Sequence, residues 1–218
     1  RSSGGIPGDD GAARVRELTG AGDVSVTMTT YDAGSIFFAD NTGIVVDGTG
    51  SLSLAAAGDL DAELGDILAE AGDIRLSASG AYVELSRVVT QSGSIGISGP
   101  TSSIDLAERP EGDALIRAGG LITIDGALRV WKGDALIQSD SGNVLFLDNV
   151  SAYEDGQELT VNALAGTADF QSTVGADSPI IVDVPLDMLT VNAGETRFHG
   201  TVLLGANGLD VTGLGPGG

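Results

Sequence analysis

The chain has 218 residues with 31 acidic and 10 basic side chains, a formal net charge of −21. This charge disfavours nucleic acid or an anionic membrane surface as a partner. With no cysteine and one histidine, the chain offers no disulfide and little basis for a zinc site. It also has no apolar run of 18 residues, so no membrane insertion is expected.

The first 21 residues are rich in glycine and weakly patterned, and only Val15 and Leu18 are plausible core residues. The chain begins without a methionine, and no basic-then-apolar signal segment follows. Two interpretations stay open: a leader was removed, or the sequence is part of a longer polypeptide. The 34 glycines, few aromatics and ordinary 42% hydrophobic content together suit a narrow, tightly packed core under an acidic surface.

From residue 22 onward, short units that open with glycine recur, and the clearest set spans residues 58–78. It reads GDLDAEL, GDILAEA, GDIRLSA, and in the last unit aliphatic residues from Ile74 to Ala78 alternate with polar ones. This period of two is typical of a half-buried strand. Glycine reaches corner conformations and the following aspartate hydrogen-bonds local backbone. The set predicts three short strands in one triangular turn of about 21 residues.

A helix is the alternative for this stretch. Leu60, Leu64, Ile67 and Leu68 also fit helical spacing. However, Gly65 would then lie inside the helix, at a cost of about 1 kcal/mol relative to alanine. The alternation in GDIRLSA follows in the same phase, so we favour strands.

The repeat continues beyond residue 80. Residues 99–111 carry two prolines and predict a corner or excursion around a strand at 103–106. Comparable glycines at 72, 93, 112 and 133 are separated by steps of 21, 19 and 21 residues. We therefore predict an all-β fold, a parallel β-helix or β-solenoid with about 20 residues per coil and about ten coils. With strands about 4.8 Å apart, this would be a rod about 50 Å long.

The pattern changes after residue 151. The sequence LTVNA occurs at 159–163 and again at 189–193, and each copy is followed by a short element that ends in Phe170 or Phe198. Between the copies, Pro179 and Pro185 mark a wider corner.

Four segments are expected. They are an N-terminal segment (1–21), a β-solenoid section of Gly-Asp coils (22–151), a β-solenoid section of LTVNA-type repeats (152–212) and a flexible Gly-rich tail (213–218). The boundary near residue 152 separates two cross-sections of one solenoid and not two independent folds.

The units GDIRLSASG, GSIGIS and GDALIRAGGLITI resemble the filamentous-haemagglutinin type of repeat in secreted bacterial surface proteins. The portion with the two LTVNA copies is similar to a longer repeat of giant bacterial adhesin-like proteins. The resemblance covers about residues 22–212. It implies a right-handed parallel β-helix, secretion to the cell surface or extracellular space, and a role in adhesion or surface structure. The secretion-domain segment of such proteins is missing here, so the secretion route is inferred.

Parallel β-helices also carry polysaccharide lyases and hydrolases, and four carboxylates lie close together in the sequence: Asp59, Asp61, Glu63 and Asp66. Two of them at a suitable separation could act as a glycosidase pair. The simpler interpretation is that aspartate recurs after glycine because it caps turns. We favour that interpretation and predict no catalytic residue, no cofactor-binding residue and no metal ligand.

Few other residues suggest chemistry. His199, the sole histidine, has no serine or aspartate constellation around it in the sequence, so we expect a surface corner residue. Trp131 and Lys132, the sole tryptophan and sole lysine, are adjacent; the tryptophan could stack on a sugar, mark an interface or cap a coil edge. The tyrosines are too dispersed to form a platform: Tyr31, Tyr82 and Tyr153.

Calcium is the remaining ion candidate. Acidic corners can supply oxygen ligands, but neither the GGxGxDxUx repeat nor an EF-hand loop is present. We expect no dedicated site, and scattered weak calcium binding stays open.

A solenoid exposes unpaired strand edges at its ends unless they are capped. Neither terminus offers an amphipathic cap, so we expect further repeats of the same polypeptide or end-to-end stacking of copies into filaments. The leading hypothesis is a non-enzymatic extracellular rod, structural or adhesive, with host or matrix glycans and proteins as candidate partners. The alternative is a carbohydrate-active β-helix enzyme.

Overall fold

The computed structural model describes residues 13–20, 26–31, 34–108, 112–175 and 183–213. Residues 1–12 and the tail 214–218 lie outside these ranges, as does the predicted corner residue Pro179. Within them every regular element is a strand and none is a helix. The strands are β1 (Ala13–Gly20), β2 (Val26–Thr29), β3 (Ile36–Val46), β4 (Leu52–Ala56), β5 (Leu60–Ala69), β6 (Ile74–Ala78), β7 (Tyr82–Thr90), β8 (Ile95–Ala107), β9 (Ala114–Ala118), β10 (Ile122–Lys132), β11 (Ala135–Ser139), β12 (Val144–Phe146), β13 (Val150–Ala152), β14 (Glu158–Phe170), β15 (Met188–Phe198) and β16 (Gly208–Gly213).

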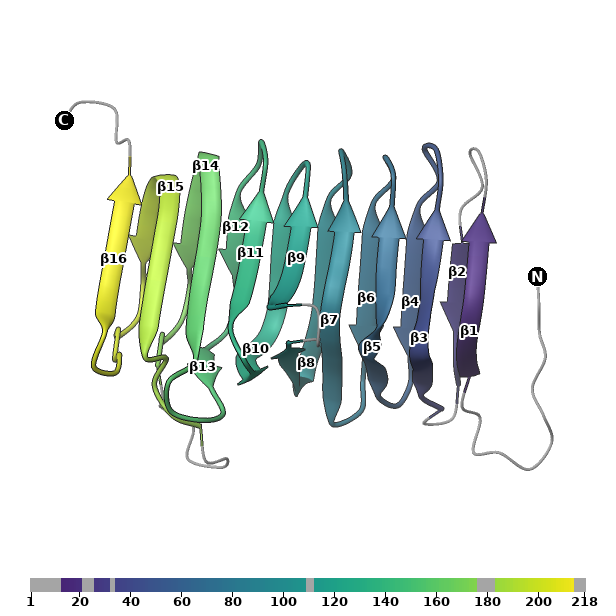
Figure 1. Ribbon diagram of the computed structural model, residues 1–218, viewed down its shortest axis with the longest axis horizontal. Helices are drawn as coiled ribbons and strands as arrows, with labels where there is room; N and C mark the ends of the chain where they lie inside the picture. The colour runs from purple at the N-terminus through teal and green to yellow at the C-terminus, as the bar shows by residue number, and fades with distance from the viewer. Residues whose placement is uncertain (1–12, 21–25, 32–33, 109–111, 176–182, 214–218) are drawn as a thin grey trace.

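The strands stack side by side along one axis, from β1 at one end to β16 at the other (Figure 1). Every pairing between named strands is parallel, and each strand pairs mainly with its counterparts one turn earlier and one turn later. The chain thus forms a parallel β-solenoid of about seven turns, and the predicted all-β fold is confirmed. The helical alternative for residues 58–78 is wrong, because β5 and β6 occupy that stretch.

Each coil has three sides, which we name A, B and C in chain order. Several strands bend from one side to the next, as β5 does where its register shifts between Ala62 and Asp66. Side A comprises β2, β4, β6, β12 and residues 95–98, 122–125, 167–170 and 195–198. Side B comprises β13 and residues 36–38, 60–62, 82–85, 103–106 and 127–130. Side C comprises β9, β11, β16 and residues 43–46, 66–69, 87–90, 159–163 and 189–193.

The coils are longer and fewer than predicted. Hydrogen bonds between equivalent positions of neighbouring coils join residues 21 apart at Asp73 and Ser94, but 24 apart at Asn143 and Thr167 and 30 apart at the Asn162–Asn192 pair. The predicted step of 19 residues compared glycines at two different corners, because Gly93 stacks on Gly72 whereas Gly112 has no atom near its Cβ position. The estimate of ten coils is therefore too high.

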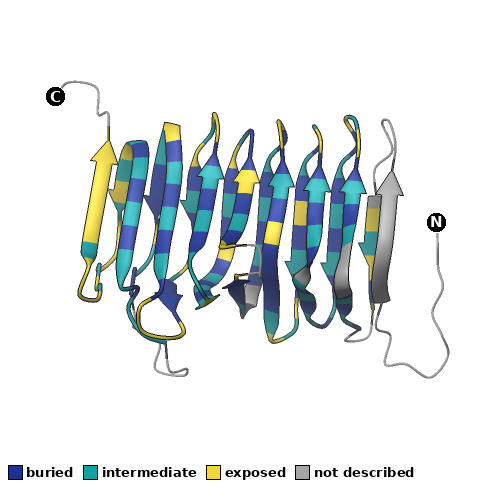
Figure 2. Ribbon diagram, viewed as in Figure 1, coloured by how far each residue is buried: buried dark blue, intermediate teal, exposed yellow. Residues whose placement is uncertain are grey.

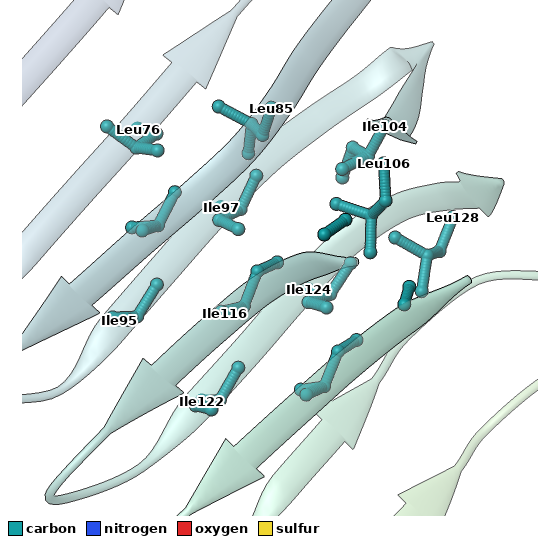
Figure 3. Close-up of a cluster of buried hydrophobic side chains, with 14 of the residues drawn as sticks. Leu76, Leu85, Ile95, Ile97, Ile104, Leu106, Ile116, Ile122, Ile124 and Leu128 are labelled. Carbon is teal, nitrogen blue, oxygen red and sulfur yellow. The ribbon is translucent and has the colours of Figure 1, made fainter. Parts of the chain in front are cut away.

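The core is a column of aliphatic side chains that runs the length of the rod. Along most strands buried and partly exposed residues alternate (Figure 2), and the inward residues of all three sides meet in the interior, as Ile97, Leu85 and Ile116 do (Figure 3). Burial of this apolar surface is the main force that holds the coils together. Within the described residues, no helix exists that could cross a membrane.

Aromatic rings continue the column toward the C-terminal end. Phe146, Phe170 and Phe198 stack with ring centroids 4.6 and 4.9 Å apart and nearly parallel planes. The two LTVNA copies lie directly on one another, with residues 159–163 of β14 in register with 189–193 of β15. The ladder continues through the predicted boundary at residue 152, because β14 also pairs with β11 and β12.

The N-terminal segment contains a strand that we did not predict. Residues 13–20 form β1, which lies against β3 on sides B and C. Its sequence ARVRELTG has no clean alternation of apolar and polar residues, so the pattern did not reveal it.

Glycines serve the corners in two ways. Gly112 and Gly133, which precede the side C strands β9 and β11, have φ of +143° and +60°, the conformational role that we expected, whereas Gly72 and Gly93 are needed for space. A Cβ atom on Gly72 would lie 1.9 Å from the carbonyl oxygen of Gly50, and one on Gly93 would lie 2.1 Å from that of Gly72. Neither glycine has a φ in the left-handed region. The corner between sides C and A therefore brings successive backbones so close that no side chain fits between them.

Candidate functional site

Side B carries a row of charged residues at outward-facing positions of its strands. The parallel register places Glu84 beside Asp61 on one neighbour and beside Asp105 on the other, and Asp105 beside Arg129. Neighbouring strands are about 4.8 Å apart, so three carboxyl groups and a guanidinium follow one another along the rod. We call this set the carboxylate row.

Glu84 is the most unusual member of the carboxylate row. Its side chain is 7% exposed, and its Oε1 atom has no hydrogen-bond partner among the described residues. Burial, together with the negative charges of Glu63 and Asp61 and a hydrogen bond with Glu63, raises the pKa of Glu84 to about 8. At neutral pH this group is therefore a carboxylic acid and can donate a proton.

Two further groups surround Glu84. Burial raises the pKa of Asp61, which accepts a hydrogen bond from the backbone N–H of Glu63 at 3.3 Å. The Lys132 ammonium forms an ion pair with Glu63 Oε1 although 69 residues separate them in sequence. The same ammonium lies 4.0 Å from the centre of the Trp131 ring.

The next members of the row form a closed ion-pair centre. Arg129, 12% exposed, donates to both oxygens of Asp105 at 2.8 and 2.7 Å and pairs with Asp183 at 3.5 Å. Its guanidinium lies 5.1 Å from the ring centre of Tyr153. Because the donors of Arg129 are engaged with carboxylates of two other coils, this centre ties the residues before β15 to side B and serves structure.

Of the four carboxylates singled out in the sequence, Asp61 and Glu63 lie beside Glu84. Asp59 instead accepts a hydrogen bond from the backbone N–H of Ala81 at 2.6 Å, one coil later. Asp66 is on side C, where it pairs with Arg87 at 3.9 Å. The sequence cluster is therefore divided among different sides of the rod.

Corner carboxylates and amides repeat the role of Asp59 along the rod. Each accepts a hydrogen bond from a backbone N–H of the next coil: Asp73 from Ser94, Asp134 from Glu158, Asn143 from Thr167, Asn149 from Thr173 and Asp187 from Ala206. We expected aspartate to bond its own local turn. The observed bonds instead join consecutive coils, so the Gly-Asp motif stabilises stacking.

Replacing Asp59 with alanine should lower the free energy of unfolding by about 1–3 kcal/mol, because two backbone N–H groups, of Ala81 and Tyr82, lose a charged acceptor. Urea denaturation of the purified protein would measure the change. Asp47→Ala, at an exposed position, is the control and should change stability by less than about 0.5 kcal/mol. Equal effects of the two substitutions would contradict the stacking role.

The remaining sequence candidates do not assemble into a constellation. Trp131 packs edge-on against Tyr153, with ring centroids 6.4 Å apart, whereas Tyr31 is 74% exposed and precedes β3. His199 is exposed on side A, where its Nε2 lies 3.0 Å from Asp169. In the described ranges, no three or more His, Cys, Asp or Glu side chains are placed so that they could hold a metal ion together.

Sequence reasoning missed Glu84 and Asp105. Both occupy an outward position of a side B strand, in YVEL and SIDL respectively. Aligning these two units with residues 60–63 would have placed Asp61, Glu84 and Asp105 in one row. The burial of Glu84 could not be found this way, because it depends on side chains from other coils.

Stability should fall as pH rises from the ordinary glutamate pKa of 4.5 through about 8, the value of Glu84 in the folded protein. In that range the folded state binds more protons than the unfolded chain, so raising the pH favours unfolding. Between about pH 5 and pH 9 the free energy of unfolding of the wild type should fall by an amount on the order of a few kcal/mol. Glu84→Gln should not show this fall.

Denaturant unfolding at several pH values would measure this slope. Glu195→Gln is the control, since the hydrogen bond from Arg197 lowers the pKa of Glu195 and its loss should leave the slope in this range unchanged. Parallel pH curves for wild type and Glu84→Gln would contradict the assignment of a buried acid.

Comparisons with protein-family models, with curated proteins and with solved structures found no match to this chain. The functional interpretation therefore depends on the fold and on side B.

Proposed function

We propose that this protein is a non-enzymatic structural or adhesive rod that acts at the cell surface or in the extracellular matrix. The observation that carries the proposal is the continuity of the solenoid: parallel ladders and one apolar column extend through about seven turns. Corner side chains add hydrogen bonds between successive coils. A rod with this construction separates its two ends, resists bending and presents its outer faces repeatedly.

The net charge of −21 supports the same proposal, because acidic rods repel one another and stay dispersed. The resemblance to filamentous-haemagglutinin repeats favours an extracellular location, with further repeats, other copies of the chain or matrix glycans and proteins as partners. We also propose a right-handed coil, since connections between parallel strands of one sheet are right-handed in nearly all proteins.

Immunogold electron microscopy with antibodies against the chain would test the proposal on cells that make it. We expect label outside the cell, on fibres or on the outer surface. Label confined to the cell interior would overturn it. Negative-stain microscopy of the purified protein would show in addition whether copies join end to end, since such filaments would be longer than a single rod.

Glu84 supports one alternative, a carbohydrate-active enzyme. A glycosidase needs a protonated carboxyl group close to an ionised one, and Glu84 has Asp61 and Glu63 as neighbours. This activity would be established if the protein released reducing ends from acidic polysaccharides and the Glu84→Gln variant did not. The 7% exposure of Glu84 argues against it, because a substrate would have to displace the groups that cover the acid.

A further inference from the structure

Lys132 holds a special place among the basic residues of the chain. It is the only lysine among the ten lysine and arginine residues. Arginine keeps its proton under all ordinary conditions, whereas a lysine ammonium can lose its proton and become a nucleophilic amine. Among these ten side chains, the one that can form an amide bond therefore lies against Glu63 and close to the buried acid Glu84.

The register explains how two distant residues meet. Lys132 is opposite Ala107, and Glu63 follows Ala62, which is opposite Leu85, itself opposite Leu106. Lys132 and Glu63 thus belong to one column at the corner of sides B and C, three coils apart. Their side chains extend toward each other along the rod and meet through Nζ and Oε1.

Glu84 supplies the second, independent feature of the site. Its carboxyl group is buried, its Oε1 has no hydrogen-bond partner among the described residues, and the Glu63 carboxyl lies within hydrogen-bonding reach of it. A buried acid such as Glu84 is not needed for a simple ion pair between Lys132 and Glu63. The pair at Arg197 and Glu195, for example, is exposed and forms without a buried acid.

We propose that Lys132 and Glu63 condense into an intramolecular amide bond, with Glu84 as the group that transfers the protons. The bond would be a covalent cross-link across three coils in a chain that has no cysteine. This cross-link would bear the same mechanical load as the hydrogen bonds between side B strands. Its formation does not depend on where the protein is located.

The reaction balances without an oxidant, reductant or cofactor. Within the ion pair, a proton first passes from the Lys132 ammonium to the Glu63 carboxylate. The resulting amine of Lys132 attacks Cδ of Glu63 while Glu84 donates a proton to the carboxyl oxygen under attack. Glu84 then accepts a proton from Nζ, and one oxygen of Glu63 leaves with two protons as water. An Nζ–Cδ bond forms, a Cδ–O bond breaks, and Glu84 ends as it began.

The arrangement favours this reaction in two ways. Groups that a fold holds in contact react as if at effective concentrations of about 10⁵ M or more. A general acid works best when its pKa is close to the ambient pH, and burial, the largest cause, raises the pKa of Glu84 even when Glu63 is uncharged. Glu84 can therefore donate a proton near neutral pH and take one back in the next step.

Intact-protein mass spectrometry of the full chain tests the proposal directly. We expect a mass lower than that of the sequence by one water molecule, and protease digestion should release a branched peptide that joins the segments with Glu63 and Lys132. A mass equal to that of the unmodified sequence, after prolonged incubation near pH 8, would overturn the proposal without the need for any variant.

Two variants assign the roles. Glu84→Gln keeps both bonding partners but cannot exchange the protons, so it should retain the full mass; loss of water in this variant would overturn the role of Glu84. The double variant Lys132→Arg, Arg197→Lys moves the only lysine next to the exposed Glu195, where it should stay unmodified. Water loss there would show that contact with a carboxylate is sufficient. Circular dichroism would confirm that each variant has the wild-type β-structure.

Discussion

Replacing Phe170 with alanine should lower the free energy of unfolding by about 3–5 kcal/mol, among the largest effects expected for a single substitution in this chain. Phe170 is 1% exposed and lies between Phe146 and Phe198 in the ring stack, with centroid distances of 4.6 and 4.9 Å. Truncation removes the apolar area of one ring, ends two ring contacts and leaves a cavity that the neighbouring coils cannot close without breaking their ladders.

Equilibrium denaturation with urea would measure the loss at Phe170. Phe198→Ala is the matched control, since Phe198 belongs to the same stack but is only partly buried, and it should cost clearly less. Similar losses at the two positions would mean that the stack does not contribute to the core as described.

Replacing Gly72 with alanine should cost about 3 kcal/mol, at the upper end of the range for overpacking. The new Cβ would lie 1.9 Å from the Gly50 carbonyl oxygen and 2.4 Å from its carbonyl carbon. Both atoms belong to backbone, so the clash can be relieved only if one coil moves away from the next. That movement would weaken hydrogen bonds at the same corner, including the one from Thr90 Oγ1 to the Gly72 carbonyl at 2.8 Å.

Gly96→Ala is the control for Gly72. Gly96 also lies on side A, within β8, but a Cβ atom there would meet no atom within 4 Å. Its effect should remain within about 0.5 kcal/mol of zero. If thermal and urea unfolding showed equal losses for both alanine variants, the corner would be looser than the structure indicates.

Much of the fold was predictable from the sequence because its repeat is short and local. Alternation of apolar and polar residues revealed strands such as β6, β9 and β11, and the two LTVNA copies that the sequence shows pair with each other in the structure. The coil length was not predictable with the same accuracy. It requires knowing which glycines occupy the same corner, and Gly93 and Gly112 do not.

The candidate site was predictable only in part. Asp61 and Glu63 attracted attention as neighbours in sequence, whereas Glu84 becomes a neighbour only when the register of β5 and β7 is known. Its acidity depends in addition on burial and on Glu63 and Lys132 from other coils. Properties of this kind arise from contacts across turns, so a pattern read along one strand does not contain them.

The three corners of the coil differ in how much extra chain they can accept. Corners next to side A bring backbones into contact, at Gly72 over Gly50 and at Gly126 over Gly99. Connections from side B to side C instead range from the short bend inside β5 to the long segment between Gly175 and Met188. Since this third corner varies most in length, a loop or a whole domain could be grafted there while the register of all ladders is kept. The rod can thus acquire new surface features without any redesign of its interior.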